Sequence, residues 1–202
     1  QIVPGDKTRN AAELLKITIN ASEDLSGSPA VQLLDSGSIV ISPSNTEKQG
    51  LTYIYSYPVL SDGSYSFTAD GTDTAGHNAT QVSITGIISD SSVPEVTGVV
   101  TVIPERIRPG VTSTVTFTAS EKMNDAGDTV EVKVGSGTVS CNTADGLSYT
   151  CTYLGSGTGS DSIETISITL TDSSANTTTT QHGTLYIDRT APVLTAQIVP
   201  GD

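Results

Sequence analysis

Apolar and polar residues alternate in short runs along most of this chain of 202 residues. Because successive side chains of an extended strand point to opposite faces of a sheet, such alternation predicts strands with one buried face. Glycine, aspartate, asparagine or proline separates neighbouring runs, as is typical of turns. The clearest runs cover residues 14–22, 51–59, 64–70, 81–88, 113–120, 129–134, 166–172 and 183–188.

This pattern predicts an all-β fold. Roughly six or seven strands in about 100 residues fit an antiparallel sandwich in which each sheet has one wet and one buried face. The strands of a parallel α/β sheet would be apolar throughout and separated by helical stretches, and the sequence contains neither feature. A closed barrel with a similar number of strands is the alternative architecture.

Four short motifs occur twice, in the same order and at a nearly constant offset. The tripeptide ASE at 21–23 recurs at 119–121, an offset of 98 residues. The four pairs are 21–23 with 119–121, 50–53 with 146–149, 73–78 with 172–176 and 90–94 with 188–192. Chance similarity within a Ser- and Thr-rich sequence would not preserve this order, so we interpret the chain as two homologous modules.

The sequence QIVPGD occurs at residues 1–6 and again at 197–202. The two copies start 196 positions apart, which is twice the offset of 98. We therefore expect one repeat over residues 1–93, a second over 94–196, and in 197–202 the start of a third repeat or a strand extension. The linker between the two repeats is expected around residues 89–97.

Three motifs of the second module resemble those of a known group of proteins. They are Ala119-Ser120-Glu121 after an early strand, Asp172-Ser173-Ser174-Ala175-Asn176 after a late strand, and Asp188-Arg189-Thr190-Ala191-Pro192 at the end of the module. In this order they resemble the bacterial Ig-like repeats of large surface adhesins and related cell-envelope proteins. The resemblance covers both modules. It implies two tandem Ig-like antiparallel β-sandwich domains in a long extracellular or cell-surface molecule.

The chain has two cysteines, Cys141 and Cys151, in two alternating runs that flank a turn at 142–146. A hairpin would place the two thiols opposite each other, within reach of a disulfide. The alternative is two free, half-buried thiols. A metal site is disfavoured because His77 and His182 are the only histidines and neither is near in sequence. A disulfide would indicate an oxidising compartment.

The formal net charge is −13, from 22 acidic and 9 basic residues. This charge repels phosphates, so nucleic acid is not an expected partner. It suits a soluble surface protein or a protein that collects cations. No apolar run is long enough to cross a membrane, so no membrane span is expected in this segment.

The carboxylates of the second repeat form a candidate calcium site. In an Ig-like sandwich the loop after the second strand and the loop before the last strand lie at the end where the chain enters. These loops contain Glu121 in one case and Asp172 with Asn176 in the other, and the linker contributes Asp90. Calcium takes six to eight oxygen ligands from such mixtures of carboxylate, amide and carbonyl groups. We therefore expect these residues to be able to hold Ca²⁺.

The first repeat has the equivalent residues Glu23, Asp73 and Asn78, and Asp188 would serve a module that follows. A bound ion would stiffen the joint between neighbouring modules. The alternative is that these residues only form turns, because aspartate and asparagine beside glycine often bond to their own backbone.

The function that we expect is structural. We expect the chain to be a stalk or spacer that projects an adhesive tip or builds an envelope layer. Its partners would be neighbouring Ig-like repeats of the same chain. An adhesin module that binds glycan or protein is one alternative, in which Tyr53, Tyr55 and Tyr57 would form a binding platform instead of one face of a strand. A self-assembling envelope or filament subunit is another, in which the QIVPGD segment completes a neighbour's sheet.

An enzyme is not expected. The sequence has no G-x-S-x-G elbow, no phosphate-binding loop and no dinucleotide fingerprint. Neither His77 nor His182 lies in a motif that would pair it with a nucleophile.

Overall fold

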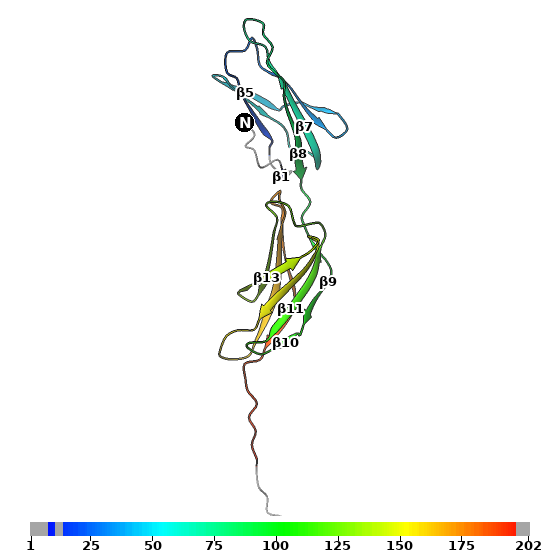
Figure 1. Cartoon of the computed structure of the whole chain (residues 1–202), viewed down its shortest axis with the longest axis vertical. Coiled ribbons are helices and arrows are strands. Elements are labelled where there is room, and N and C mark those ends of the chain that lie inside the picture. The colour runs from blue at the N-terminus through cyan, green and yellow to red at the C-terminus, as the bar shows by residue number, and fades with distance from the viewer. Residues whose placement is uncertain (1–7, 11–13, 197–202) are drawn as a thin grey trace, which may run out of the picture. The chain divides into compact units, whose positions relative to one another are not determined.

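The computed structural model describes residues 8–10 and 14–196. Residues 1–7, 11–13 and 197–202, and with them both copies of QIVPGD, lie outside the described residues. By its contacts the chain divides into two compact units, which are described separately (Figure 1). The first unit contains residues 1–93 together with 171–176, and the second contains 94–170 together with 177–202.

The first unit contains two sheets. One has the strand order β1-β8-β7-β3-β4 and the other the order β2-β6-β5. The strands are β1 (Thr8–Asn10), β2 (Lys16–Asn20), β3 (Ala30–Asp35), β4 (Val40–Ile41), β5 (Asn45–Gln49), β6 (Thr52–Ser56), β7 (Gly63–Asp70) and β8 (Val82–Asp90). β1 runs parallel to β8, whereas the other pairs between these strands are antiparallel. Two separate sheets make this unit a sandwich and not a closed barrel.

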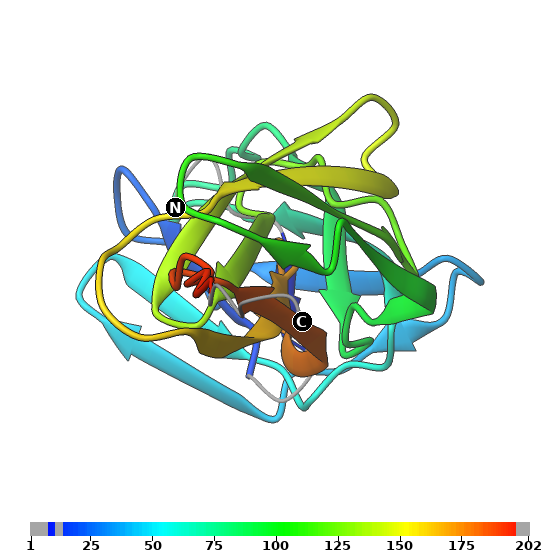
Figure 2. The same ribbon diagram turned by 90° about the horizontal axis from the view of Figure 1, so that it is seen from below.

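In the second repeat the strands are joined in one sheet, in the order β10-β16-β15-β12-β13-β14-β11-β9. The strands are β9 (Val96–Ile103), β10 (Arg106–Ile107), β11 (Thr112–Ala119), β12 (Thr129–Val134), β13 (Gly137–Thr143), β14 (Ser148–Leu154), β15 (Ser162–Thr171) and β16 (Thr177–Ile187). Residues 137–139 of β13 pair with β12 and residues 140–143 pair with β14, so one strand serves both layers. Figure 2 shows the strands of the first repeat in blue to teal and those of the second in green to orange.

The predicted all-β, Ig-like sandwich fold is confirmed, and its core explains the alternating pattern. In β11 the side chains of Val115 and Phe117 are buried, whereas the threonines between them are less so. In β6 the buried side chains are Tyr53 and Tyr55, and Tyr57 follows in the same core. The tyrosine row is therefore the inner face of a strand.

The buried apolar residues form two separate clusters, one for each repeat. The first cluster is Leu15, Ile17, Leu33, Tyr53, Tyr55, Tyr57, Leu60, Tyr65, Phe67, Ala69 and Ile87. The second is Ile107, Val115, Phe117, Ala119, Met123, Val132, Val134, Val139, Tyr149, Cys151, Ile166, Ile168, Leu170, Leu185 and Ile187. No residue belongs to both, so each repeat excludes water from a core of its own.

Separate cores predict separate stabilities. Phe67→Ala empties space in the first core and Ile168→Ala does so in the second, and both side chains are fully buried. Each substitution is expected to lower the free energy of unfolding of its own repeat by about 2–5 kcal/mol. Differential scanning calorimetry should then show one transition shifted down and the other retained, with the shifted transition exchanged between the two variants. A single transition that shifts equally in both variants would contradict this prediction.

Candidate functional site

The loop at residues 172–176, between β15 and β16, is folded around one carboxylate. Asp172 Oδ1 accepts hydrogen bonds from the backbone N–H of Ser174 at 2.8 Å and of Asn176 at 2.9 Å. Asp172 Oδ2 accepts a third from Asn176 Nδ2 at 2.8 Å. All three residues are buried. This carboxylate therefore holds the loop in shape, as aspartates do in turns.

The equivalent loop of the first repeat, at residues 73–77, is built in the same way. Asp73 Oδ1 accepts hydrogen bonds from the backbone N–H of Ala75 and of His77, both at 2.8 Å. Asp73 Oδ2 lies 2.8 Å from His77 Nδ1. In both loops the N–H of the aspartate donates to the carbonyl four residues later, His77 or Asn176. The spatial counterpart of Asn176 is therefore His77, although the sequence motifs align it with Asn78.

The two loops differ in exposure. The His77 side chain is 83% exposed, whereas Asn176 is only 6% exposed. Hydrogen bonds from the His77 backbone N–H, and next from its ring, lower the pKa of the Asp73 carboxyl below its ordinary value. Asn78 lies one position further along, where its Oδ1 accepts a hydrogen bond from Thr72 Oγ1 at 2.9 Å.

The Asn176 amide also binds the end of β8. By its contacts, loop 172–176 belongs to the first unit, as does Asp90. Asn176 Nδ2 donates to the carbonyl oxygen of Asp90 at 3.1 Å, in addition to its bond to Asp172. The carboxylate of Asp90 accepts the backbone N–H of Ser92 at 2.9 Å. Three of the predicted calcium ligands thus meet, but through amide and carbonyl groups more than through carboxylates.

Each repeat also fixes its exit segment, which we define as residues 90–94 in the first repeat and 188–192 in the second. Asp62 accepts hydrogen bonds from Ser91, through its backbone N–H at 2.8 Å and its hydroxyl at 2.9 Å. Asp161 accepts the backbone N–H of Arg189 at 2.7 Å and the hydroxyl of Thr190 at 2.9 Å.

The two hooking residues, Asp62 and Asp161, were not singled out from the sequence. Hydrogen bonds from the Arg189 backbone, the Tyr186 hydroxyl and Thr190 lower the pKa of the Asp161 carboxyl. The signal that could have found the pair is the dipeptide Ser-Asp at 61–62, which recurs at 160–161.

The remaining predicted ligands are distributed as follows. Glu23, Asp73 and Asn78 line one pocket of about 370 Å³ in the first unit. Glu121 is half-buried and follows the end of β11 in the second unit. Asp188 lies in the second exit segment, where its carboxylate accepts the backbone N–H of Thr190 at 3.2 Å.

The described residues contain no group of three or more His, Cys, Asp or Glu side chains placed to hold a metal ion. The carboxylates of Asp73 and Asp172 are already bonded within their loops. Calcium binding by the predicted ligands stays a prediction, and it needs a test in solution. Over the same part of the chain, no helix is long and apolar enough to cross a membrane.

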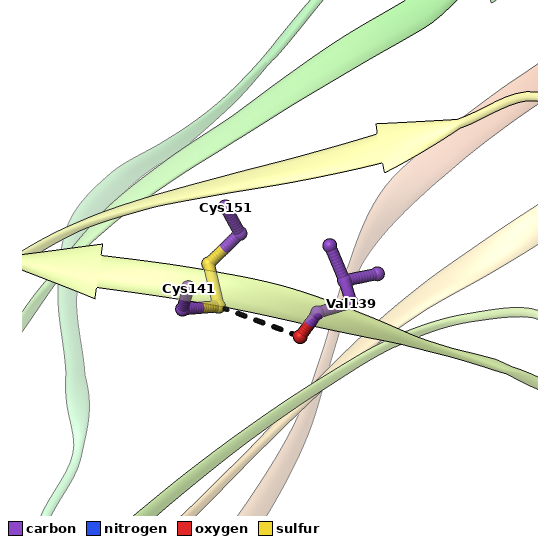
Figure 3. The surroundings of a disulfide bond; sticks show 3 residues. All are labelled: Val139, Cys141 and Cys151. Carbon is purple, nitrogen blue, oxygen red and sulfur yellow. Dashed lines mark hydrogen bonds between the residues drawn. A yellow bond between two sulfur atoms is a disulfide. The ribbon is translucent and has the colours of Figure 1, made fainter.

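The predicted disulfide is formed between Cys141 on β13 and Cys151 on β14, with an S–S distance of 2.04 Å (Figure 3). The two cysteines lie directly opposite each other in the register of the antiparallel pair. Cys151 is fully buried in the second core, and Cys141 packs against it. A disulfide of this kind indicates an oxidising compartment, as is typical of extracellular domains.

Asp145 organises the turn that joins these two strands. Its Oδ1 accepts the backbone N–H of Leu147 at 2.9 Å and of Ser148 at 2.7 Å. These bonds, the one from Ser148 first, lower the pKa of the Asp145 carboxyl to about 2. The register that brings Cys141 opposite Cys151 is therefore supported by the turn next to it.

Comparison with known proteins supports the fold. No protein-family model and no curated protein matches the sequence. Among solved structures, the chain is similar to the fibronectin(III)-like modules of Clostridium thermocellum CbhA, with 14% identity, 95% of each chain covered and a TM-score of 0.53. It also matches a three-domain Ig structure of titin, with 10% identity, 91% of this chain and 62% of that chain covered, and a TM-score of 0.42. At 14% identity, the likeness to the CbhA modules concerns the fold alone.

The disulfide is expected to stabilise the second repeat. Its cysteines are ten residues apart, and closing a loop of this length contributes about 2–3 kcal/mol. Replacing Cys141 and Cys151 with alanine should lower the free energy of unfolding of the second repeat by this amount in urea titrations, as should a reductant. The first repeat is the internal control, since it has no cysteine. An unchanged urea midpoint would contradict the prediction.

Asp145 predicts a pH-dependent contribution to stability. Its pKa in the folded state, about 2, is below that of an unfolded aspartate, about 3.9. The carboxylate therefore stabilises the fold fully above about pH 4, and this contribution is lost as the pH falls through about 2. Asp145→Asn should be less stable than the parent protein at pH 7, and the difference should vanish near pH 2. A difference that stays constant over this range in urea titrations would argue against it.

Proposed function

We propose that the chain is a load-bearing spacer built of tandem Ig-like repeats in a long extracellular or cell-surface protein. Separate cores support the proposal, because each repeat can then carry tension without depending on its neighbour. In the finer form of the proposal, the spacer is part of an adhesin or cell-envelope protein, in line with the resemblance seen in the sequence. No catalytic role is proposed.

The observation that carries the proposal is the parallel pairing, within each repeat, of the last strand with a short strand near the beginning. β1 pairs with β8 through Thr8–Ile88, Arg9–Ser89 and Asn10–Asp90. Tension on the chain pulls the start of β1 one way and the end of β8 the other. Because the strands are parallel, this load shears all the hydrogen bonds between them together and does not open them one after another.

The second repeat has a similar parallel pair, although β9 precedes it and pairs antiparallel with β11. β10 pairs in parallel with β16, through Arg106–Tyr186 and Ile107–Ile187. The backbone N–H of Tyr186 donates to the carbonyl of Glu105 at 2.9 Å, and that of Asp188 donates to the carbonyl of Ile107 at 2.8 Å. These bonds tie the segment that follows β9 to the end of the repeat, so a load that reaches this segment shears them together.

A glycan platform receives no support from the aromatic residues. Tyr53, Tyr55 and Tyr57 are at most 3% exposed. Every other tyrosine and phenylalanine of the chain is buried or half-buried. Stacking against a sugar ring requires an exposed aromatic face, so the spacer is the function we favour over a glycan-binding module.

Single-molecule pulling tests the mechanical role. The chain should give two unfolding events, one for each repeat. The locked segment between Cys141 and Cys151 should shorten the second extension by about 30 Å, and a reductant should restore this length. Tyr186→Pro removes the N–H that bonds to Glu105, so it should lower the unfolding force of the second repeat only. Tyr186→Phe keeps this N–H and is the matched control. Equal forces in all three proteins would contradict the proposal.

Stiffening by calcium, through Asp90, Glu121, Asp172 and Asn176, is a separate proposal with its own test. An ion that binds only the folded state raises the melting temperature with its concentration. Calorimetry of the chain in calcium and in a chelator should therefore show a higher transition with calcium. Identical transition temperatures up to millimolar calcium would rule out the calcium proposal and leave the proposed spacer function standing.

A further inference from the structure

The pocket of about 370 Å³ in the first unit is lined by both apolar and acidic side chains. The apolar lining includes Ile19, Leu25, Pro29, Ala69 and Val82. The polar lining includes Glu23, Asp70, Asp73, His77 and Asn78. Apolar surface beside polar groups is typical of sites that receive another segment of protein.

The bond between loop 172–176 and Asp90 suggests what the equivalent loop 73–77 could bind. Asn176 holds Asp172 with one amide hydrogen and the carbonyl of Asp90 with the other. Loop 172–176 thus takes hold of an exit segment at its first residue, and the loop is buried. The counterpart loop at 73–77 has the same internal bonds but an exposed His77, whose Nδ1 is engaged with Asp73 and whose Nε2 remains for a further contact.

The two exit segments are built alike. Both begin with an aspartate that accepts the backbone N–H two residues later, at Ser92 or Thr190. In both, the next residue donates its backbone N–H to an aspartate of a Ser-Asp dipeptide, Asp62 or Asp161. Segment 188–192 therefore offers a loop the same backbone hydrogen-bonding pattern that segment 90–94 offers to loop 172–176.

Charge favours the same pairing. The second exit segment shares a pocket with Arg106 and Arg108, although the chain has only 9 basic residues in all. The guanidinium of Arg189, within the segment, is bonded to Ser156, Ser160 and Ser162. Arg106 and Arg108 are exposed, and the guanidinium of Arg106 lies 4.0 Å from the ring centroid of Tyr186. Arg106 and Arg108 would face the carboxylates of Glu23 and Asp70 in the polar lining of the pocket.

We propose that the pocket and loop 73–77 of one copy receive the exit segment 188–192 of a second copy. In this joint His77 carries a proton on both ring nitrogens, so that Nδ1–H donates to Asp73 and Nε2–H donates to the Asp188 carbonyl, as the Asn176 amide donates to Asp172 and to the Asp90 carbonyl. The inference rests on the proposed spacer function, since repeats in line must meet at such joints. It adds a specific joint between copies. In this joint His77 contacts the Asp188 carbonyl, and Arg108 lies near the acidic residues of the pocket.

The test uses a tandem protein in which residues 1–202 continue directly into residues 7–202 of a second copy, so that one QIVPGD serves both. Thr74→Ser in the second copy gives its loop peptide a distinct mass. In hydrogen exchange followed by mass spectrometry, the second-copy peptide over 72–80 should exchange about tenfold more slowly than the first-copy peptide. The peptide over loop 172–176 is the internal standard for a loop that holds an exit segment.

Two pairs of variants give the proposal its specificity. In the second copy, His77→Ala should remove the protection, whereas His77→Asn, which copies the second repeat, should keep it. In the first copy, Arg108→Glu should weaken protection of the second-copy loop. Lys133→Glu makes the same charge change on β12, outside the exit segment, and should have no effect.

Equal exchange of the two loop peptides would overturn the proposed joint. If pulling of the same tandem protein still gave one event for each repeat, the spacer function would survive with flexible joints. If the pulling events were also lost, the proposed function itself would fail. Protection that persists in His77→Ala would likewise overturn the assigned contact.

Discussion

The burial of two apolar clusters, each inside its own pair of sheet faces, is the constraint on which the rest of the structure depends. A sandwich of this kind has one inner side chain for every two strand residues, which is why Val115 and Phe117 alternate with threonine. The cores are closed within each repeat. The ends of the repeats consist of polar loops, and there the hydrogen bonds of a few aspartates fix the loop conformations.

The strands with clear alternation and the disulfide could be predicted from the sequence because each depends on local order, whereas β3, β5 and β9 lie outside the predicted runs. Alternation specifies which face of β6 is buried, and a turn centred on Asp145 sets Cys141 opposite Cys151. The candidate site was less predictable. Asp73 and Asp172 were recognised as important, but their hydrogen bonds to the backbone two and four residues later are decided by loop geometry.

One residue of difference in loop length misled the alignment. Matching the motifs places Asn78 against Asn176, yet the bonds of the loops equate Asn176 with His77. The hooking aspartates Asp62 and Asp161 were missed for a related reason. A Ser-Asp dipeptide is common in a Ser-rich chain, and only the folded structure shows that both copies bind an exit segment.

Each repeat therefore combines a core of its own with loops and exit segments that defined hydrogen bonds hold in place. The parallel pairs β1–β8 and β10–β16 join an early strand of each repeat to its last strand. In both repeats the exit segment is held by its own first aspartate and by Asp62 or Asp161. The most direct test of the central claim is equilibrium unfolding of residues 94–196 alone. The account predicts a cooperative transition and retained exchange protection in β11 and β15; an unfolded fragment would contradict it.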